Sequence, residues 1–221
     1  MTDRSIEELA KLGQKSLETA EKAGGWLDQV FGGGFRHLGG AFEDSMAGYR
    51  MRNRMRVVEK TQAAIKRARF AGNTRQLDPR IGVQVYDAIA DESDDMLQDV
   101  WAEYIKNAIN PKMPHPDRLL IDVIRRLEPS DWPILRIVFS RAVGDLVSSD
   151  FEASESELTS ALDRMEVIGL FDYDDDTVQY IVAKSNVGSR LTITVGKAEY
   201  TATRLLRRLG EATRDLWSNG D

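Results

Sequence analysis

Four carboxylates near the middle of the chain are the first candidates for metal chemistry. Asp91, Glu92, Asp94 and Asp95 lie close together, and carboxylate oxygens are the ligands that hard cations prefer. The cluster lacks the alternating ligands and the central glycine of an EF-hand loop. Acidic residues are also favoured at the start of a helix by its dipole. We therefore interpret this cluster as a helix start.

The other candidate groups have equally simple explanations. The acidic run Asp172, Asp174, Asp175 and Asp176 is typical of a hydrated turn. His37 and His115 have no histidine or cysteine at a metal-binding spacing. Glycines 32–34 are not followed by Gly-Lys-Ser/Thr, as a phosphate-binding loop requires. We therefore expect no catalytic residue, no metal and no cofactor, and we leave open a hydrolase without a recognisable motif.

Composition indicates a globular protein. The 221 residues are 42% hydrophobic and 30% charged, which is enough to fill an ordinary core. The chain has no cysteine, so disulfides are excluded and a reducing cytoplasm is expected. Its first residues lack the basic-then-apolar order of a signal peptide. Because charged residues interrupt the best apolar stretch, we expect no membrane-spanning helix.

Charge is strongly segregated along the chain. Residues 50–75 hold nine basic side chains and only Glu59, whereas residues 87–103 hold seven acidic side chains and no basic one. Residues 145–176 hold eleven acidic side chains and only Arg164. These blocks predict either charged faces that pair within the fold or a basic surface for phosphates or anionic lipid.

A glycine-rich aromatic repeat stands near the N-terminus. Phe35, Phe42 and Tyr49 are spaced seven apart, which is two turns of a helix that packs against another helix. Eight glycines between 24 and 48 oppose an isolated helix, because each costs about 1 kcal/mol relative to alanine. We expect a partner helix, a second copy or a lipid surface to stabilise it. The alternative is two loops and a broken helix around 32–34 and 39–40.

On a helical wheel, the apolar residues of this repeat share one face, with small residues mainly opposite. We predict an oligomer or membrane interface made by Leu27, Phe31, Phe35, Leu38, Phe42 and Tyr49. The arginines that follow would contact an anionic surface, namely Arg50, Arg52, Arg54 and Arg56.

Helical periodicity and capping signals predict a mainly helical fold. We expect helices over 3–23, 26–49, 50–71, 79–90, 94–109, 117–127, 130–147, 155–168 and 195–209. Short strands are expected at 171–173, 178–182 and 190–194. We divide the chain into amphipathic, Gly-rich and basic helices (1–72), a helical body (73–129) and a winged-helix-like α+β module (130–221).

The expected winged module is a poor DNA reader. Its second helix, 155–168, carries Glu155, Glu157, Asp163 and Glu166 against Arg164 alone. Such a helix would normally enter the major groove, where phosphate charge would repel it. A protein-binding or structural role is the better interpretation. The arginines of the final helix lie on the other side of the module.

Five segments together resemble the bacterial abortive-infection alpha (Abi-alpha) family. The best of them is the acid-rich run Asp-Glu-Ser-Asp-Asp-Met-Leu-Gln-Asp-Val-Trp at 91–101. The others are 51–62, 77–81, 127–131 and 191–196, so that the resemblance spans about 50–205. The resemblance implies a role in bacterial defence against phage, in which infected cells die or stop growing. It carries over no active-site residue.

Three functions therefore remain open. The first is an anti-phage protein that acts without catalysis, when the 26–49 helix oligomerises or is released onto the inner membrane. The second is an adaptor or scaffold, likewise a homo-oligomer or bound to a partner protein that kills the cell. The third is a nucleic-acid-binding regulator that uses the basic segment 50–75.

Overall fold

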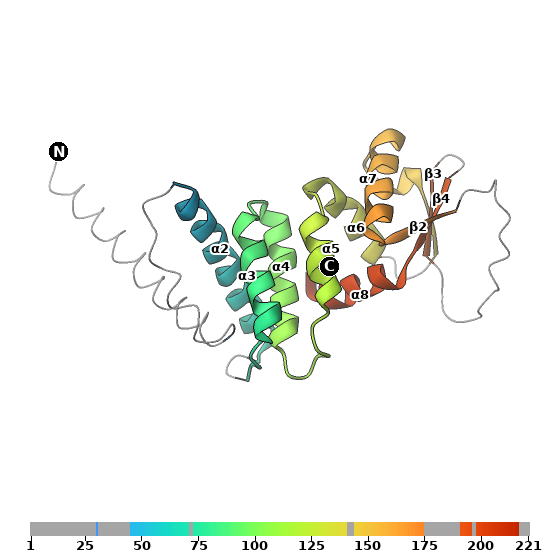
Figure 1. The fold of residues 1–221 in the computed structure, drawn as a ribbon. Helices are drawn as coiled ribbons and strands as arrows, with labels where there is room; N and C mark the ends of the chain where they lie inside the picture. Colours follow the sequence, from blue (N-terminus) through green and yellow to red (C-terminus); the bar gives the residue numbers. More distant parts are fainter. Residues whose placement is uncertain are drawn as a thin grey trace. The chain divides into compact units, whose positions relative to one another are not determined.

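The computed structural model describes residues 30, 45–70, 73–140, 144–174, 191–195 and 198–216 of the 221-residue chain. These residues form seven α-helices and a small sheet, so the expectation of a mainly helical protein is confirmed (Figure 1). The predicted helix 3–23, most of the 26–49 repeat and the predicted strand 178–182 lie outside the described residues.

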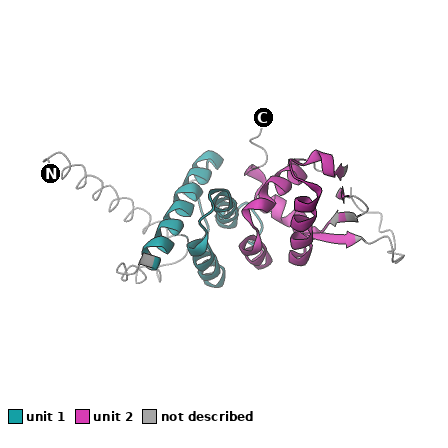
Figure 2. Cartoon of the chain, turned by 90° about the horizontal axis from the view of Figure 1, so that it is seen from above, with its two compact units in different colours: residues 1–116 teal, residues 117–221 magenta. Residues whose placement is uncertain are grey.

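The chain forms two compact units, residues 1–116 and 117–221, called unit 1 and unit 2 below (Figure 2). This division differs from the three domains with boundaries at 72 and 129 that the sequence suggests. The reason is that helix α2 (Ser45–Ala68) packs along α3 (Pro79–Asp91) and α4 (Asp95–Ile109), so the basic helix and the helical body share one core.

The helices of unit 1 begin where the sequence signals place them, within a few residues. Asp78 caps α3 by accepting from the backbone N–H of Arg80, with Pro79 in the first turn. Asp94, rather than Ser93, caps α4. Helix α2 ends at Ala68 instead of residue 71, because Arg69 adopts a left-handed conformation with φ of 56°.

Unit 1 is held together by an apolar core between these helices. The buried side chains come from all three of them: Val57, Val58 and Ile65 of α2, Val85 and Ile89 of α3, and Val100, Trp101 and Ile105 of α4. The same facing surfaces carry the basic residues of α2 and the acidic residues of α3 and α4 at their edges.

The described residues of unit 2 contain four α-helices. They are α5 (Arg118–Arg126), α6 (Trp132–Ser140), α7 (Glu155–Ile168) and α8 (Arg204–Ala212). Short 3-10 turns occupy Pro129–Asp131, Ser148–Asp150 and Arg214–Leu216. The capping box of Ser154 and Glu157 at the start of α7 is confirmed, as is Gly169, with φ of 87°, at its end.

A four-stranded sheet completes unit 2. The strands are β1 (Gly144–Val147), β2 (Phe171–Asp174), β3 (Leu191–Val195) and β4 (Ala198–Ala202). Their order is β1-β3-β4-β2, with β1 parallel to β3 and the other pairs antiparallel. The predicted strands at 171–173 and 190–194 are thus confirmed.

Two predicted helices of unit 2 are wrong. The helix expected over 130–147 ends at Ser140, and β1 follows it. The helix expected over 195–209 is β4 in its first half, and α8 begins only after the cap Thr203. Strand β1 pairs with β3, and β4 pairs with both β3 and β2, so each strand is decided by tertiary pairing rather than by local propensity.

Candidate functional site

The N-terminal half of α2 is joined to α3 by its basic side chains. Arg50 Nε donates to Asp91 Oδ1 at 2.8 Å. Arg54 donates to the carbonyl oxygen of Tyr86 at 3.2 Å, and its guanidinium lies 4.0 Å from the centroid of the Tyr86 ring. Arg54 also lies 4.0 Å from Asp87. These contacts satisfy Arg50 and Arg54 within unit 1.

The C-terminal half of α2 makes the same kind of contact with α4. Lys60 Nζ donates to Asp99 at 2.7 Å and lies 3.0 Å from Asp95. Partial burial opposes the charge of Lys60, but hydrogen bonds to Asp99 and Asp95 outweigh it and raise the pKa of Lys60. Arg67 lies 3.9 Å from Glu103. Four basic residues of α2, namely Arg50, Arg54, Lys60 and Arg67, are therefore paired with acids of the first acidic block inside one unit.

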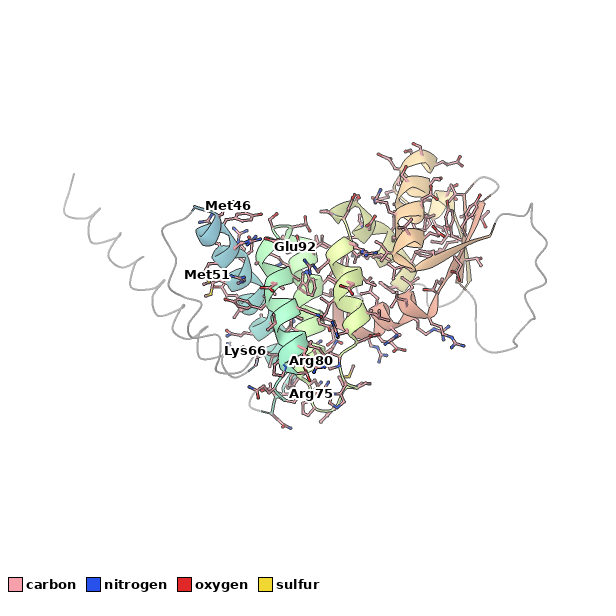
Figure 3. The ribbon with its side chains drawn as sticks, viewed as in Figure 1. Met46, Met51, Lys66, Arg75, Arg80 and Glu92 are labelled. Carbon is pink, nitrogen blue, oxygen red and sulfur yellow. The ribbon has the colours of Figure 1, made fainter. Side chains whose placement is uncertain are left out.

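The four arginines predicted to contact an anionic surface do not share a face. Arg50 and Arg54 turn toward α3, whereas Arg52 and Arg56 are exposed. Helical spacing explains the split, because residues four apart lie on one side of a helix and residues two apart do not. The exposed stripe of α2 carries Arg52, Arg56 and Lys66 with Glu59 between them, and Lys66 is labelled in Figure 3.

Tyr49 is the one member of the predicted oligomer or membrane interface that falls within the described residues. It is half-buried, and hydrogen bonds with Ser93 and Asn53 lower the pKa of Tyr49. Asn53 in turn donates to the carbonyl oxygen of Ala90 at 2.9 Å. Tyr49 therefore contacts the corner between α3 and α4. Leu27, Phe31, Phe35, Leu38 and Phe42 lie outside the described residues.

The four carboxylates of the candidate metal cluster lie where α3 ends and α4 begins. Asp94 is the cap of α4, Asp91 binds Arg50, and Asp95 lies beside Lys60. Glu92, labelled in Figure 3, accepts from the backbone N–H of Asp94 at 2.9 Å, and burial raises the pKa of Glu92. Among the described residues no group of three acidic or histidine side chains is placed to hold a metal ion.

The sequence pattern does not predict a buried ion pair that the structure shows on α4. Glu103 and Lys106 are one helical turn apart, bonded to each other, and only 3% and 2% exposed. Burial also raises the pKa of Tyr104, which lies between Glu103 and Lys106 in the sequence. Nothing in the local pattern separates this pair from an exposed one, because charges three residues apart are typical of a solvated helix face. Its chemistry is that of a packed, mutually neutralised pair.

The exposed surface of α7 is acidic. Glu155, Glu157, Asp163 and Glu166 are exposed. The one basic residue of this helix, Arg164, turns inward, with its Nη2 donating to Asp131 at 2.6 Å and its Nε 3.4 Å from Glu128. Arg164 is thus engaged by unit 2 itself, which adds to the argument against DNA binding by this helix.

The opposite charge gathers on α5 and α8. Arg208 forms an ion pair with Asp117, the cap of α5. The surrounding arginines of the two helices are exposed: Arg118, Arg125, Arg126, Arg204 and Arg207. The sequence shows that the final helix is basic, but only the packing of α8 on α5 brings the two sets of arginines into one region.

Comparisons with protein-family models, with curated proteins and with solved structures give no match. Among the described residues, no helix is long and apolar enough to cross a membrane.

Proposed function

We propose that this chain is a bacterial anti-phage protein of the abortive-infection type that acts by binding other macromolecules, in the first place further copies of itself. The observation that carries this proposal is the internal pairing of Arg50, Arg54, Lys60 and Arg67 with acids of α3 and α4. It makes α2 part of the core of unit 1 rather than a free basic arm. The aromatic repeat thus leads into α2, a helix that packs into the core of unit 1.

The role in defence rests on the resemblance of residues 50–205 to the Abi-alpha family. A protein-binding, winged-helix-like module is part of this proposal. The succession of α6 and α7 by strands β2, β3 and β4 supports it, with β1 lying between the two helices. The acidic exposed surface of α7 favours a protein partner over DNA. An assembly of this kind either damages the cell itself or serves as an adaptor for a partner that does.

The experiment that tests assembly uses the aromatic repeat in the full chain. We expect Phe35→Asp to lower the mass of the assembly in solution, because a buried charge in an apolar helix interface is strongly unfavourable. Phe35→Leu keeps the apolar character and is the matched control. The same two variants, expressed in bacteria challenged with phage, should lose and keep protection respectively. Unchanged mass and protection in Phe35→Asp would overturn the proposal.

Membrane engagement is the second candidate, because Arg52, Arg56 and Lys66 remain exposed on the outer stripe of α2. Basic side chains near a membrane contribute about 1 kcal/mol each toward anionic lipid. If this function is correct, Arg52→Glu with Arg56→Glu should abolish binding of the full chain to phosphatidylserine vesicles. If the protein acts through assembly alone, the wild-type protein should not bind those vesicles.

A further inference from the structure

The whole net charge of the protein belongs to unit 2. Residues 1–116 contain 17 acidic and 17 basic side chains, whereas residues 117–221 contain 19 acidic and 13 basic ones. Unit 2 nevertheless concentrates its basic residues on α5 and α8. A basic region on an acidic body calls for an explanation beyond general solubility.

The basic side chains of α5 and α8 are all arginines and outnumber the exposed acids of these helices, Asp122 and Glu211. All nine basic residues among the described residues of unit 2 are arginines, namely 118, 125, 126, 136, 164, 204, 207, 208 and 214. A guanidinium presents a planar fork of donors that matches a carboxylate or a phosphate, whereas an ammonium is a point charge. Arg208 already forms an ion pair with Asp117, whereas Arg204 and Arg207 are exposed to solvent.

The acidic region is the exposed surface of α7. Glu157 and Asp163 accept local hydrogen bonds from the hydroxyls of Ser154 and Tyr200, respectively. A carboxylate accepts about four hydrogen bonds and so keeps free capacity. Glu166 and Glu155 lie on the same side of the helix, three turns apart. The end of α7 and the start of α8 are joined where Thr203 donates to the carbonyl oxygen of Gly169 at 2.7 Å, and the two helices run in different directions from there (Figure 1).

We propose that the arginine face of α5 and α8 binds the acidic face of α7 in a second copy of this chain. The two faces have opposite charge and belong to the same unit. Each copy can therefore bind one neighbour through its arginine face and another through its acidic face. When each contact uses one arginine face and one acidic face, it is heterologous and produces a ring or an open chain. A nucleic acid fits less well, because its phosphates would also meet the acid excess of unit 2.

This contact lies outside residues 26–49 and does not depend on the proposed defence function. If the mass depends on Phe35 and not on the arginine face, the assembly proposed above stands and this inference falls. If the mass depends on the arginine face and the protein gives no protection from phage, this inference stands and the proposed defence function falls.

The test is a charge swap in the full chain, measured by light scattering at about 50 mM salt, where the screening length exceeds 10 Å. The first variant is Arg204→Glu with Arg207→Glu, and the second is Glu155→Arg with Glu166→Arg. We expect each alone to weaken self-association about tenfold or more, because like charges then face each other. An equimolar mixture of the two should associate again. Arg52→Glu with Arg56→Glu changes the charge equally on unit 1 and should leave the mass unchanged.

Two outcomes would overturn the inference. The first is a monomeric wild type at about 100 μM and low salt, because a specific contact of useful strength would be populated there. The second is full self-association of the Arg204 and Arg207 variant. If that variant also loses binding to a duplex oligonucleotide, the arginine face is assigned to nucleic acid.

Discussion

The ion pair between Arg164 and Asp131 joins two elements of unit 2 through a buried carboxylate. Asp131 is fully buried, and the Arg164 guanidinium reaches it at 2.6 Å from α7. The carboxylate also accepts from the backbone N–H of Glu128 at 2.8 Å. The pair therefore fastens α7 to the turn before α6, and it explains why the one arginine of the acidic helix is turned away from solvent.

Replacing Arg164 should destabilise unit 2 strongly. We expect Arg164→Ala to lower the free energy of unfolding by about 2–4 kcal/mol, because it leaves a buried carboxylate without its cation. Arg136→Ala, which removes an exposed arginine of α6, should change it by less than about 0.5 kcal/mol. Urea unfolding measures both, and equal effects of the two substitutions would contradict this role of Asp131.

Glu92 should make the protein less stable as the pH rises. Burial raises the pKa of Glu92 above the ordinary value of 4.5, so the folded state holds the proton more tightly than the unfolded chain. The contribution of Glu92 to stability is thus full below pH 4.5 and is lost as the pH rises through the raised pKa.

Glu92→Gln keeps the acceptor for the backbone N–H of Asp94 and removes the charge. We expect the variant and wild type to be equally stable near pH 4 and the variant to be the more stable at pH 7, as measured by chemical unfolding at each pH. Glu59→Gln, at an exposed site on α2, is the control without this trend. A difference that shrinks between pH 4 and pH 7 would show that the sign is wrong.

At the level of elements, two helical glycines should respond to alanine with opposite signs. A Cβ on Gly210 of α8 would lie 2.6 Å from Cε1 and 2.8 Å from Cδ1 of Phe139, a residue of α6. A Cβ on Gly48 of α2 would have Arg52 Nη1 at 3.8 Å as its nearest neighbour. The first glycine permits close helix packing, whereas the second only weakens its helix.

Gly210→Ala should cost about 1–3 kcal/mol through overpacking, and Gly48→Ala should stabilise by up to about 1 kcal/mol through helix propensity. Thermal unfolding of the two variants measures both signs. Phe139→Leu in the Gly210→Ala background makes room for the methyl group and should recover part of the loss. A stabilising Gly210→Ala would show that α6 and α8 do not pack as closely as described.

Gly210 also illustrates what the sequence can and cannot predict about elements. A glycine near the end of a periodic segment is read as a helix stop, yet α8 continues to Ala212. Helix starts were predictable because a cap such as Asp78 or Ser154 acts through its immediate neighbours. Strands β1 and β4 were not, because both depend on β3, which β1 meets across more than 40 residues of chain.

The candidate site follows the same rule. That basic and acidic blocks pair could be predicted from composition, but the partners could not. Arg50 and Arg54 differ from Arg52 and Arg56 only in which side of α2 faces the core, and this depends on α3 and α4. The buried pair of Glu103 and Lys106 depends on packing in the same way.

At the level of the whole molecule, the two units should respond to salt in opposite directions. Unit 1 is electrically balanced, and its charges attract each other across α2, α3 and α4, so screening should weaken it. Unit 2 has an excess of six acidic residues, so screening should relieve its self-repulsion. Each unit contains a buried tryptophan that can report its own unfolding: Trp101 in unit 1 and Trp132 in unit 2.

Two variants in which phenylalanine replaces every tryptophan except Trp101 or Trp132 allow this measurement. Between about 0.05 and 0.5 M NaCl we expect the urea midpoint reported by Trp101 to fall and that reported by Trp132 to rise, since the Debye length shortens from about 14 to 4 Å. Repeating the series near pH 4 should abolish the rise at Trp132, because protonation removes the acid excess of unit 2. Midpoints that move together at both pH values would mean that pairing in unit 1 and repulsion in unit 2 do not govern the stability of the two units.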